Sequence, residues 1–142
     1  MNIGLIGYGV VGRAAANTLE KEYHLVKYDK YQNLDKFENL VDCDFVFVMV
    51  PTPFNYEMKQ VDESAVLESL EKLRSLNYSG IVVIKSTIPP GSCSIYSTNF
   101  KLKIAFNPEF LRESTTPNKD FENQDTIVIG TPDKEIFNSI KS

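Results

Sequence analysis

Nearly continuous apolar runs alternate with amphipathic segments along this chain. Such runs are typical of strands whose two faces are both covered. We expect strands at Ile3–Ile6, His24–Tyr28, Asp44–Val50, Ile81–Lys85, Lys103–Phe106 and Thr126–Gly130. Between them, apolar residues recur at helical spacing, which predicts helices at about Val10–Lys21, Asn33–Asp42, Asp62–Leu73, Ser92–Phe100 and Pro132–Ile140. Two further segments show neither pattern and are expected to be loops, Phe54–Gln60 and Asp120–Asp125.

Strands that alternate with helices form a parallel sheet between two helical layers, joined by right-handed crossovers. The predicted fold class is therefore α/β, with a doubly wound, mostly parallel sheet of the Rossmann type. A chain of 142 residues is long enough for one hydrophobic core. We interpret residues 1–142 as a single domain.

Composition and charge argue against several classes of partner. The formal net charge is −4 and the pI is about 5.0, without a basic block, so we expect no nucleic acid and no membrane partner. No apolar run has the length of a membrane span, and the first run leads into glycines rather than a cleavage site, so we expect a cytoplasmic protein. Cys43 and Cys93 lie far apart without companion ligands, which argues against a metal site or a disulfide.

The first strand is followed at once by a glycine motif and then by an Ala-rich helix. Gly7 permits a tight turn, Gly9 lets the backbone approach a pyrophosphate, and Gly12 allows the helix to pack closely on the strand. The N–H groups at a helix start form a phosphate site. A motif of this kind is also found in ordinary glycine-rich turns. In this context it predicts a dinucleotide site formed by Gly7, Tyr8, Gly9, Val10, Val11 and Gly12.

The second predicted strand ends at Asp29, about twenty residues past the glycines. A carboxylate at this point is expected to accept hydrogen bonds from the ribose hydroxyls of the adenosine. It also repels a 2′-phosphate, which favours NAD over NADP, although Lys30 weakens that preference slightly. The alternative interpretation of Asp29 is a solvated turn residue.

Further polar clusters follow the other predicted strands. In this kind of sheet, ligands bind in the crevice outside the carboxyl ends of the strands. Thr52 lies there between two prolines, Ser86 and Thr87 follow the fourth strand, and two carboxylates, Glu109 and Glu113, follow the fifth. The pattern predicts a dinucleotide-binding domain with carboxylates near the nicotinamide end.

Four motifs in this order resemble the N-terminal domain of the UDP-glucose/GDP-mannose dehydrogenases, over about Asn2 to Gly130. They are Gly7-Tyr8-Gly9-Val10-Val11-Gly12, Val50-Pro51-Thr52-Pro53, Ser86-Thr87-Ile88-Pro89-Pro90-Gly91 and Asn107-Pro108-Glu109-Phe110-Leu111-Arg112-Glu113. Enzymes of that family oxidise a sugar C6 alcohol to a carboxylate in two NAD-dependent steps, through a thioester on a cysteine. The last motif is the most specific, because a generic dinucleotide-binding domain has no need of it.

The resemblance assigns roles to individual residues. It implies that NAD is held by Gly7 to Gly12, Asp29, Val50, Pro51, Thr52, Pro53, Ser86, Thr87 and Glu113. It implies that a nucleotide sugar is contacted by Glu109, Phe110, Leu111, Arg112 and Glu113. Glu109 is the implied general base or acid around thioester hydrolysis, and Thr87 the implied residue that orients water or substrate. The alternatives are a helix-capping Glu109, a solvated Glu113 and a turn-forming Thr87.

The chain also departs from the family pattern. Ser114-Thr115-Thr116 stands where the family has Gly and then Ala, and Gln124-Asp125-Thr126 stands where Pro-Asp-Arg is usual. The family's catalytic cysteine, and the lysine and asparagine that assist it, belong to central and C-terminal segments that have no counterpart in residues 1–142. Neither Cys43 nor Cys93 has a matching context. We therefore expect activity only when a cysteine-bearing segment is present. The chain is expected to form either a homodimer or a complex with a partner chain that carries the catalytic cysteine.

Two other functions remain open at the level of sequence. One is a non-catalytic NAD- or nucleotide-binding subunit or sensor. The other is a small reductase with Glu109 as proton donor.

Overall fold

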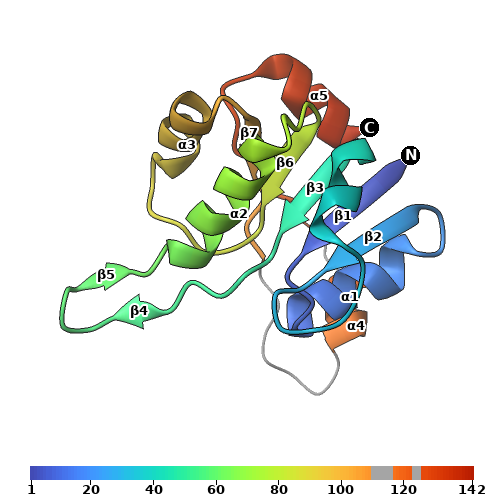
Figure 1. Ribbon diagram of the computed structural model, residues 1–142, viewed down its shortest axis with the longest axis horizontal. Helices are drawn as coiled ribbons and strands as arrows, with labels where there is room; N and C mark the ends of the chain where they lie inside the picture. The colour runs from blue at the N-terminus through green and yellow to red at the C-terminus, as the bar shows by residue number, and fades with distance from the viewer. Residues whose placement is uncertain (110–116, 123–125) are drawn as a thin grey trace.

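The computed structural model describes residues 1–109, 117–122 and 126–142. A five-stranded parallel sheet forms its centre, in the order β2-β1-β3-β6-β7 (Figure 1). The strands are β1 (Asn2–Ile6), β2 (His24–Tyr28), β3 (Phe45–Val48), β6 (Ile81–Ile84) and β7 (Lys103–Phe106). The order changes direction between β1 and β3. The predicted α/β doubly wound sheet is confirmed, and its switch point lies at these two strands.

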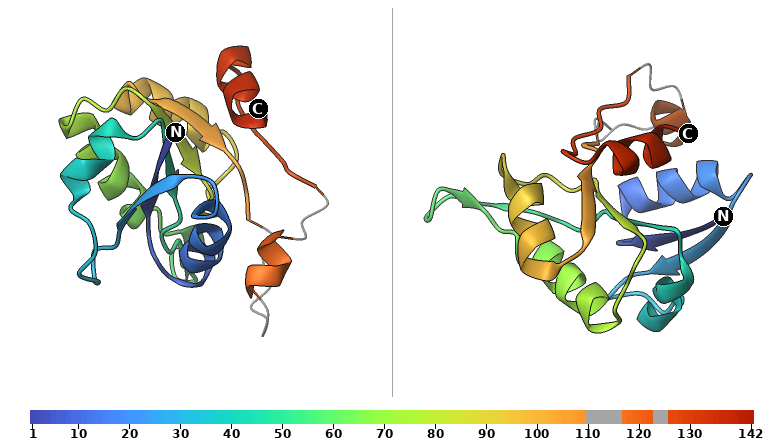
Figure 2. Two further views of the ribbon diagram at one scale, coloured as in Figure 1. Left: turned by 90° about the vertical axis from the view of Figure 1, so that its right-hand side faces the viewer. Right: turned by 90° about the horizontal axis from the view of Figure 1, so that it is seen from above.

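Helices cover both faces of the sheet. The view from above in Figure 2 separates the two layers. On one side lie α1 (Val10–Leu19) and α5 (Lys134–Lys141), and α4 (Pro117–Glu122) packs against α1. On the other side lie the 3-10 helix η1 (Phe37–Asp42), α2 (Ser64–Ser75) and α3 (Ser92–Phe100).

The strand residues explain this sandwich, because successive side chains point to opposite faces. Ile3 and Leu5 of β1 pack with Ala15 and Ala16 of α1. Ile6, at the end of the same strand, joins the larger cluster on the opposite face. That cluster unites the sheet with η1, α2 and α3 through Leu40, Val46, Val48, Val66, Leu70, Leu73, Val82, Ile84, Tyr96 and Ile104.

The sixth predicted strand, Thr126–Gly130, is wrong. Gly130 alone pairs with Phe106, as an isolated antiparallel bridge. The Ile127 side chain is 70% exposed. The apolar run resembles a buried strand, but within the described part of the chain nothing covers it on both sides, so it lacks the burial that would stabilise a further strand.

Two predicted loops contain regular structure. Asp120–Asp125 overlaps α4, which begins at Pro117, where a proline is tolerated because its missing N–H has no helical partner. Phe54–Gln60 forms most of a hairpin of β4 (Phe54–Asn55) and β5 (Gln60–Val61). The Asn55 Oδ1 accepts hydrogen bonds from the N–H groups of Glu57 and Met58, which fixes the turn.

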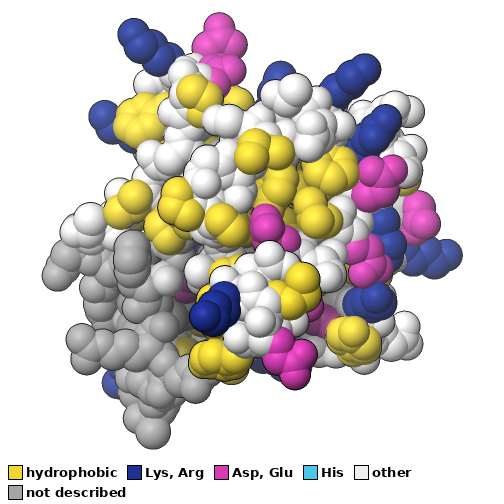
Figure 3. All heavy atoms as spheres, turned by 90° about the vertical axis from the view of Figure 1, so that its left-hand side faces the viewer, with side chains coloured by type: hydrophobic (Ala, Val, Ile, Leu, Met, Phe, Trp, Pro, Cys, Tyr) yellow, Lys and Arg dark blue, Asp and Glu magenta, His cyan; other side chains and the backbone are white. Residues whose placement is uncertain are grey.

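The β4–β5 hairpin projects away from the body of the molecule (Figure 1). It carries three exposed apolar side chains, Phe54, Tyr56 and Met58. Figure 3 views the molecule from the hairpin side, where hydrophobic side chains lie among acidic and basic ones. The hairpin continues the loop after β3 and leads into α2.

Candidate functional site

A cavity of about 600 Å³ lies at the switch point of the sheet. This volume falls within the range of small-molecule sites. Its walls come from the end of β1 and the glycine turn with the start of α1, the end of β2, the start of η1, the loop after β3, and α2 with the segment that leads into it. The residues are Ile6, Gly7, Gly9, Val10, Val11, Tyr28, Asp29, Lys30, Tyr31, Phe37, Met49, Val50, Pro51, Pro53, Asp62, Ser64, Ala65, Glu68, Ser69 and Lys72.

The three glycines of the turn meet different surroundings. Gly7 has a φ of +95°, and a Cβ built on it would lie 2.5 Å from the Met49 carbonyl oxygen. A Cβ on Gly12 would lie 2.2 Å from the Gly7 carbonyl oxygen, since helix and turn touch there. A Cβ on Gly9 would meet nothing within 4 Å. Gly7 and Gly12 are therefore required by packing, whereas Gly9 leaves an opening at the start of α1.

Asp29 ties the end of β2 to the glycine turn. Its Oδ2 accepts a hydrogen bond of 2.7 Å from the Tyr8 N–H, and its Oδ1 accepts one of 2.9 Å from the Tyr31 N–H. The Gln32 side chain donates to the Tyr8 carbonyl oxygen. Asp29 is thus a half-buried carboxylate that two backbone N–H groups hold at the cavity wall.

The surroundings of Asp29 favour its ionised form. Burial acts to raise the pKa of this carboxyl, but the hydrogen bonds from Tyr8, Tyr31 and Gln32 and the nearby Arg13 charge outweigh it and lower the pKa below its ordinary value of 3.8. Arg13 in turn lies 4.9 Å from the centre of the Tyr8 ring. The wall therefore carries a full negative charge at neutral pH.

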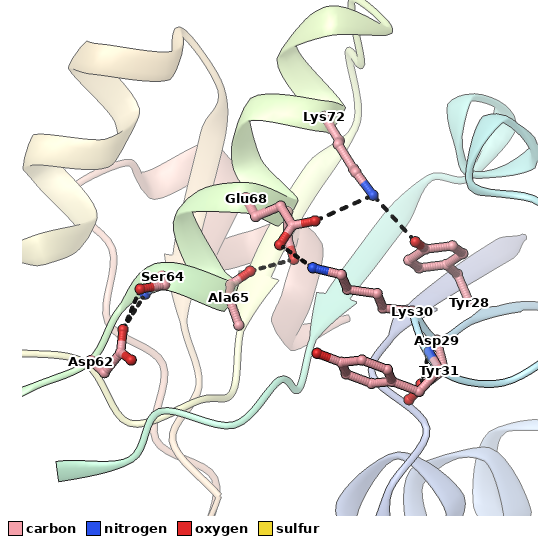
Figure 4. Close-up of polar contacts among 10 residues, drawn as sticks. Tyr28, Asp29, Lys30, Tyr31, Asp62, Ser64, Ala65, Glu68 and Lys72 are labelled. Atoms are coloured by element: carbon pink, nitrogen blue, oxygen red, sulfur yellow. Dashed lines mark hydrogen bonds and ion pairs between the residues drawn. The ribbon is translucent and has the colours of Figure 1, made fainter. Parts of the chain in front are cut away.

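A group of charges spans the mouth of the cavity (Figure 4). The Lys30 Nζ lies 3.0 Å from Glu68 Oε2, and the Lys72 Nζ lies 3.6 Å from Glu68 Oε1. The Lys72 Nζ also donates to the Tyr28 hydroxyl at 3.3 Å. These contacts connect α2 with the end of β2, so they join two walls of the cavity.

A second polar cluster lies at the ends of β6 and β7. The Lys85 Nζ is 3.1 Å from Glu109 Oε2, and both side chains are 7% exposed. Lys85 also donates to Asn107 Oδ1 at 2.7 Å. Burial lowers the pKa of Lys85, and the Glu109 charge opposes this by holding the proton on the amine. The cluster is a buried ion pair beside the crevice.

The structure places the remaining predicted site residues in different situations. Val50, Pro51 and Pro53 line the cavity, whereas the half-buried Thr52 does not. The buried Ser86 hydroxyl donates to the Val50 carbonyl oxygen at 2.7 Å, and Thr87 is exposed. Phe110, Leu111, Arg112 and Glu113 lie outside the described residues.

Comparison with known proteins supplies the family. A family model described as the NAD binding domain of the UDP-glucose/GDP-mannose dehydrogenase family matches residues 25–142. The chain belongs to this family. The glycine turn precedes the matched range, so the turn and the family model are independent indications of a dinucleotide.

Similar proteins agree with this assignment. The UDP-glucose 6-dehydrogenase of Rickettsia conorii is 38% identical over 112 residues, which cover 75% of this chain and 25% of that protein. The enzyme of the same name from Pseudomonas aeruginosa is 32% identical over 116 residues, covering 73% and 25%. The UDP-glucose dehydrogenase structure from Pyrobaculum islandicum has a TM-score of 0.81 at 24% identity, covering 98% of this chain and 42% of that one. The chain spans about a quarter of the length of these curated relatives.

NAD is the cofactor of this dehydrogenase domain, and the geometry fits it. The opening at Gly9 leaves room for a phosphate at a helix start, and Asp29 presents a carboxylate beside it. Among the described residues, no cluster of side chains fits a metal ion. The same residues include no helix that is long and apolar enough to cross a membrane.

Sequence reasoning missed two groups of charged side chains at or near the candidate site. It gave no role to Lys85, although a lysine that ends an otherwise apolar strand is an unusual residue to bury. It also gave no role to Glu68 and Lys72, because their position at the cavity mouth depends on how α2 packs against the sheet.

Proposed function

We propose that this chain holds NAD in the 600 Å³ cavity and serves as the cofactor-binding part of a nucleotide-sugar 6-dehydrogenase. The observation that supports this most directly is the pairing of an open Gly9 with a fixed Asp29 carboxylate across one cavity. Bound NAD would supply the hydride acceptor for oxidation of an alcohol. UDP-glucose is the substrate that the names of the relatives suggest.

In this proposal each wall has its own task. The start of α1 holds the pyrophosphate through backbone N–H groups and the positive end of the helix dipole. Each Asp29 oxygen accepts one backbone N–H, and each retains acceptor capacity for a ribose hydroxyl. Val50, Pro51 and Pro53, in the loop after β3, present apolar surface to the cofactor.

Glu109 carries the kind of side chain that general acid–base chemistry uses. Its Oε2 lies 3.1 Å from the Lys85 Nζ. A carboxylate can accept a proton from a water or an alcohol placed beside it. We assign Glu109 the general base and acid role, Lys85 a positioning role, and Thr87 the orientation of water or substrate.

The thiol for a covalent step is proposed to come from another segment, on the same chain or on a partner. Burial raises the pKa of both Cys43 and Cys93 to about 11, the former with help from nearby aspartates, so neither is a ready thiolate nucleophile. A homodimer is proposed as a separate possibility, because a second copy of residues 1–142 would bring only the same two cysteines. Both thiols are free, which fits the reducing cytoplasm as the compartment.

The test is a pair of glycine variants. Gly9→Ala places a methyl group in the opening where the pyrophosphate is proposed to lie, and it meets no protein atom within 4 Å. Gly130→Ala is the matched control, because its Cβ makes ordinary contact with Phe106, which does not line the cavity. We expect both variants to stay within about 0.5 kcal/mol of the parent stability, and only Gly9→Ala to lose NAD affinity, by about tenfold or more.

Titration of the purified chain with NAD and NADH, followed by calorimetry and by NADH fluorescence, measures this affinity. Equal NAD affinity of Gly9→Ala and the parent contradicts the proposed site. A second assay supplies UDP-glucose and NAD to the chain alone and records NADH. Sustained NADH production would show that residues 1–142 need no cysteine-bearing segment.

A further inference from the structure

The charges at the cavity mouth are arranged around one carboxylate. Glu68 lies on α2 and contacts two lysines that come from different walls, Lys30 after β2 and Lys72 one turn further along α2. All three line the cavity. Figure 4 shows the Lys30 side chain extending toward Glu68, close to the Asp29 position. The Glu68 carboxylate is therefore the negative group that both lysines of the mouth contact.

The position of Lys30 gives this arrangement a chemical consequence. Lys30 follows Asp29, the residue that is proposed to accept the adenosine ribose hydroxyls. A phosphate on the 2′-hydroxyl would lie near that carboxylate and within reach of a lysine beside it. An unpaired Lys30, supported by Lys72, would attract the phosphate and offset the repulsion from Asp29.

We propose that Glu68 is a specificity-determining residue that, together with Asp29, excludes 2′-phosphorylated dinucleotides. It does so by pairing with Lys30 and Lys72 and by adding its own negative charge to the mouth. The four charged groups Asp29, Lys30, Glu68 and Lys72 sum to zero, and Asp62 adds a further negative charge to the cavity lining. Removal of the Glu68 charge leaves Lys30 and Lys72 without the carboxylate that they share. This inference rests on the proposed NAD site and deepens it.

The variant Glu68→Gln tests the inference with little effect on the fold, because the side chain is 42% exposed and the substitution keeps its shape. We expect NADP affinity to rise about tenfold, and NAD affinity to stay within about threefold of the parent. Glu71→Gln is the matched control. Glu71 lies on the same helix, pairs with Arg74 at 3.7 Å and does not line the cavity, so neither affinity should change.

A double variant identifies the cation. In the Glu68→Gln background, Lys30→Met should return NADP affinity to about the parent level. Calorimetric titration with NAD and NADP, at low and at physiological salt, measures each affinity, and the gain in NADP binding should shrink as salt rises.

The outcomes separate the two proposals. A parent chain that binds neither dinucleotide overturns the proposed function. A parent that binds NAD, with an unchanged NADP-to-NAD ratio in Glu68→Gln, overturns the role of Glu68 and leaves the NAD site in place. Equal changes in Glu68→Gln and Glu71→Gln also overturn it, because they would show a general effect of net charge.

Discussion

Replacing Lys85 by Met is expected to be far more damaging than the same change at Lys21, although the Lys21 ion pair is shorter. Lys21 Nζ lies 2.6 Å from Glu122, with side chains 61% and 36% exposed, whereas the Lys85–Glu109 distance is 3.1 Å with both side chains 7% exposed. An exposed pair contributes about 1 kcal/mol or less. Loss of one partner of a buried pair costs about 3–5 kcal/mol, because the other charge stays buried without compensation.

For a domain of this size, that cost corresponds to a melting temperature lower by about 10–20 °C. Urea unfolding followed by circular dichroism measures the free energy directly. The double variant Lys85→Met/Glu109→Leu should recover most of the Lys85→Met deficit, because it removes the uncompensated charge. Similar losses of unfolding free energy in Lys85→Met and Lys21→Met would refute the reasoning, since burial would then not determine how much an ion pair contributes to stability.

Two further predictions concern other titratable groups. The pKa of Asp29 lies below its ordinary value of 3.8, so its contribution to stability is complete above that pH and is lost as the pH falls through the lower folded-state value. Asp29→Asn should be less stable than the parent at pH 7, because an amide offers one acceptor oxygen to two N–H donors. In urea titrations from pH 7 to pH 3, the variant should lose less of its unfolding free energy in acid than the parent does. Since burial raises the pKa of Cys43 and Cys93 from 9.0 to about 11, a disulfide reagent should label the folded chain at pH 7 about a hundredfold more slowly than the urea-unfolded chain, and labelling at equal rates would show that the thiols are not protected.

Hydrophobic pattern predicted the inner parallel strands well, because a strand that is covered on both faces must be apolar on both. The run Ile81–Ile84 lies between β3 and β7 and is buried by helices on either side, as its composition requires. The same reasoning failed at Thr126–Gly130. A run of apolar residues indicates that burial of the segment is favourable. Whether it is buried depends on whether other helices or strands pack against both of its faces.

Short elements were missed for a related reason. The two strands of the β4–β5 hairpin are held by the Asn55 turn, and Lys59 adopts a φ of +51°, so the hairpin depends on local backbone geometry rather than on periodicity. The six-residue α4 is too short to be stable alone. It is stabilised by packing on α1, a contact between segments far apart in sequence.

The arrangement at the proposed cofactor end of the site was more predictable from sequence than that at the proposed substrate end. Spacing from the glycines is enough to identify Asp29, because β1 and β2 are adjacent and in parallel register from Asn2–His24 to Ile6–Tyr28. The Lys85–Glu109 pair joins the ends of β6 and β7. Lys85 was missed because a single charge at the end of a strand is usually solvated, and its burial becomes visible only when the neighbouring strand end is placed.

The neighbouring residues Ser86 and Thr87 have different surroundings in the structure. Both residues follow β6, which ends at Ile84, and their side chains differ in burial. The buried Ser86 donates to the Val50 carbonyl oxygen, which fixes the end of β6 to the cavity-lining end of β3, while Thr87 is exposed. Because Lys85 precedes Ser86 directly, this hydrogen bond also fixes the Lys85–Glu109 pair relative to the cavity. The hydroxyl of Ser86 thus connects the proposed cofactor end of the site with its proposed substrate end, and Thr87 is the one of the two that is free to meet a ligand.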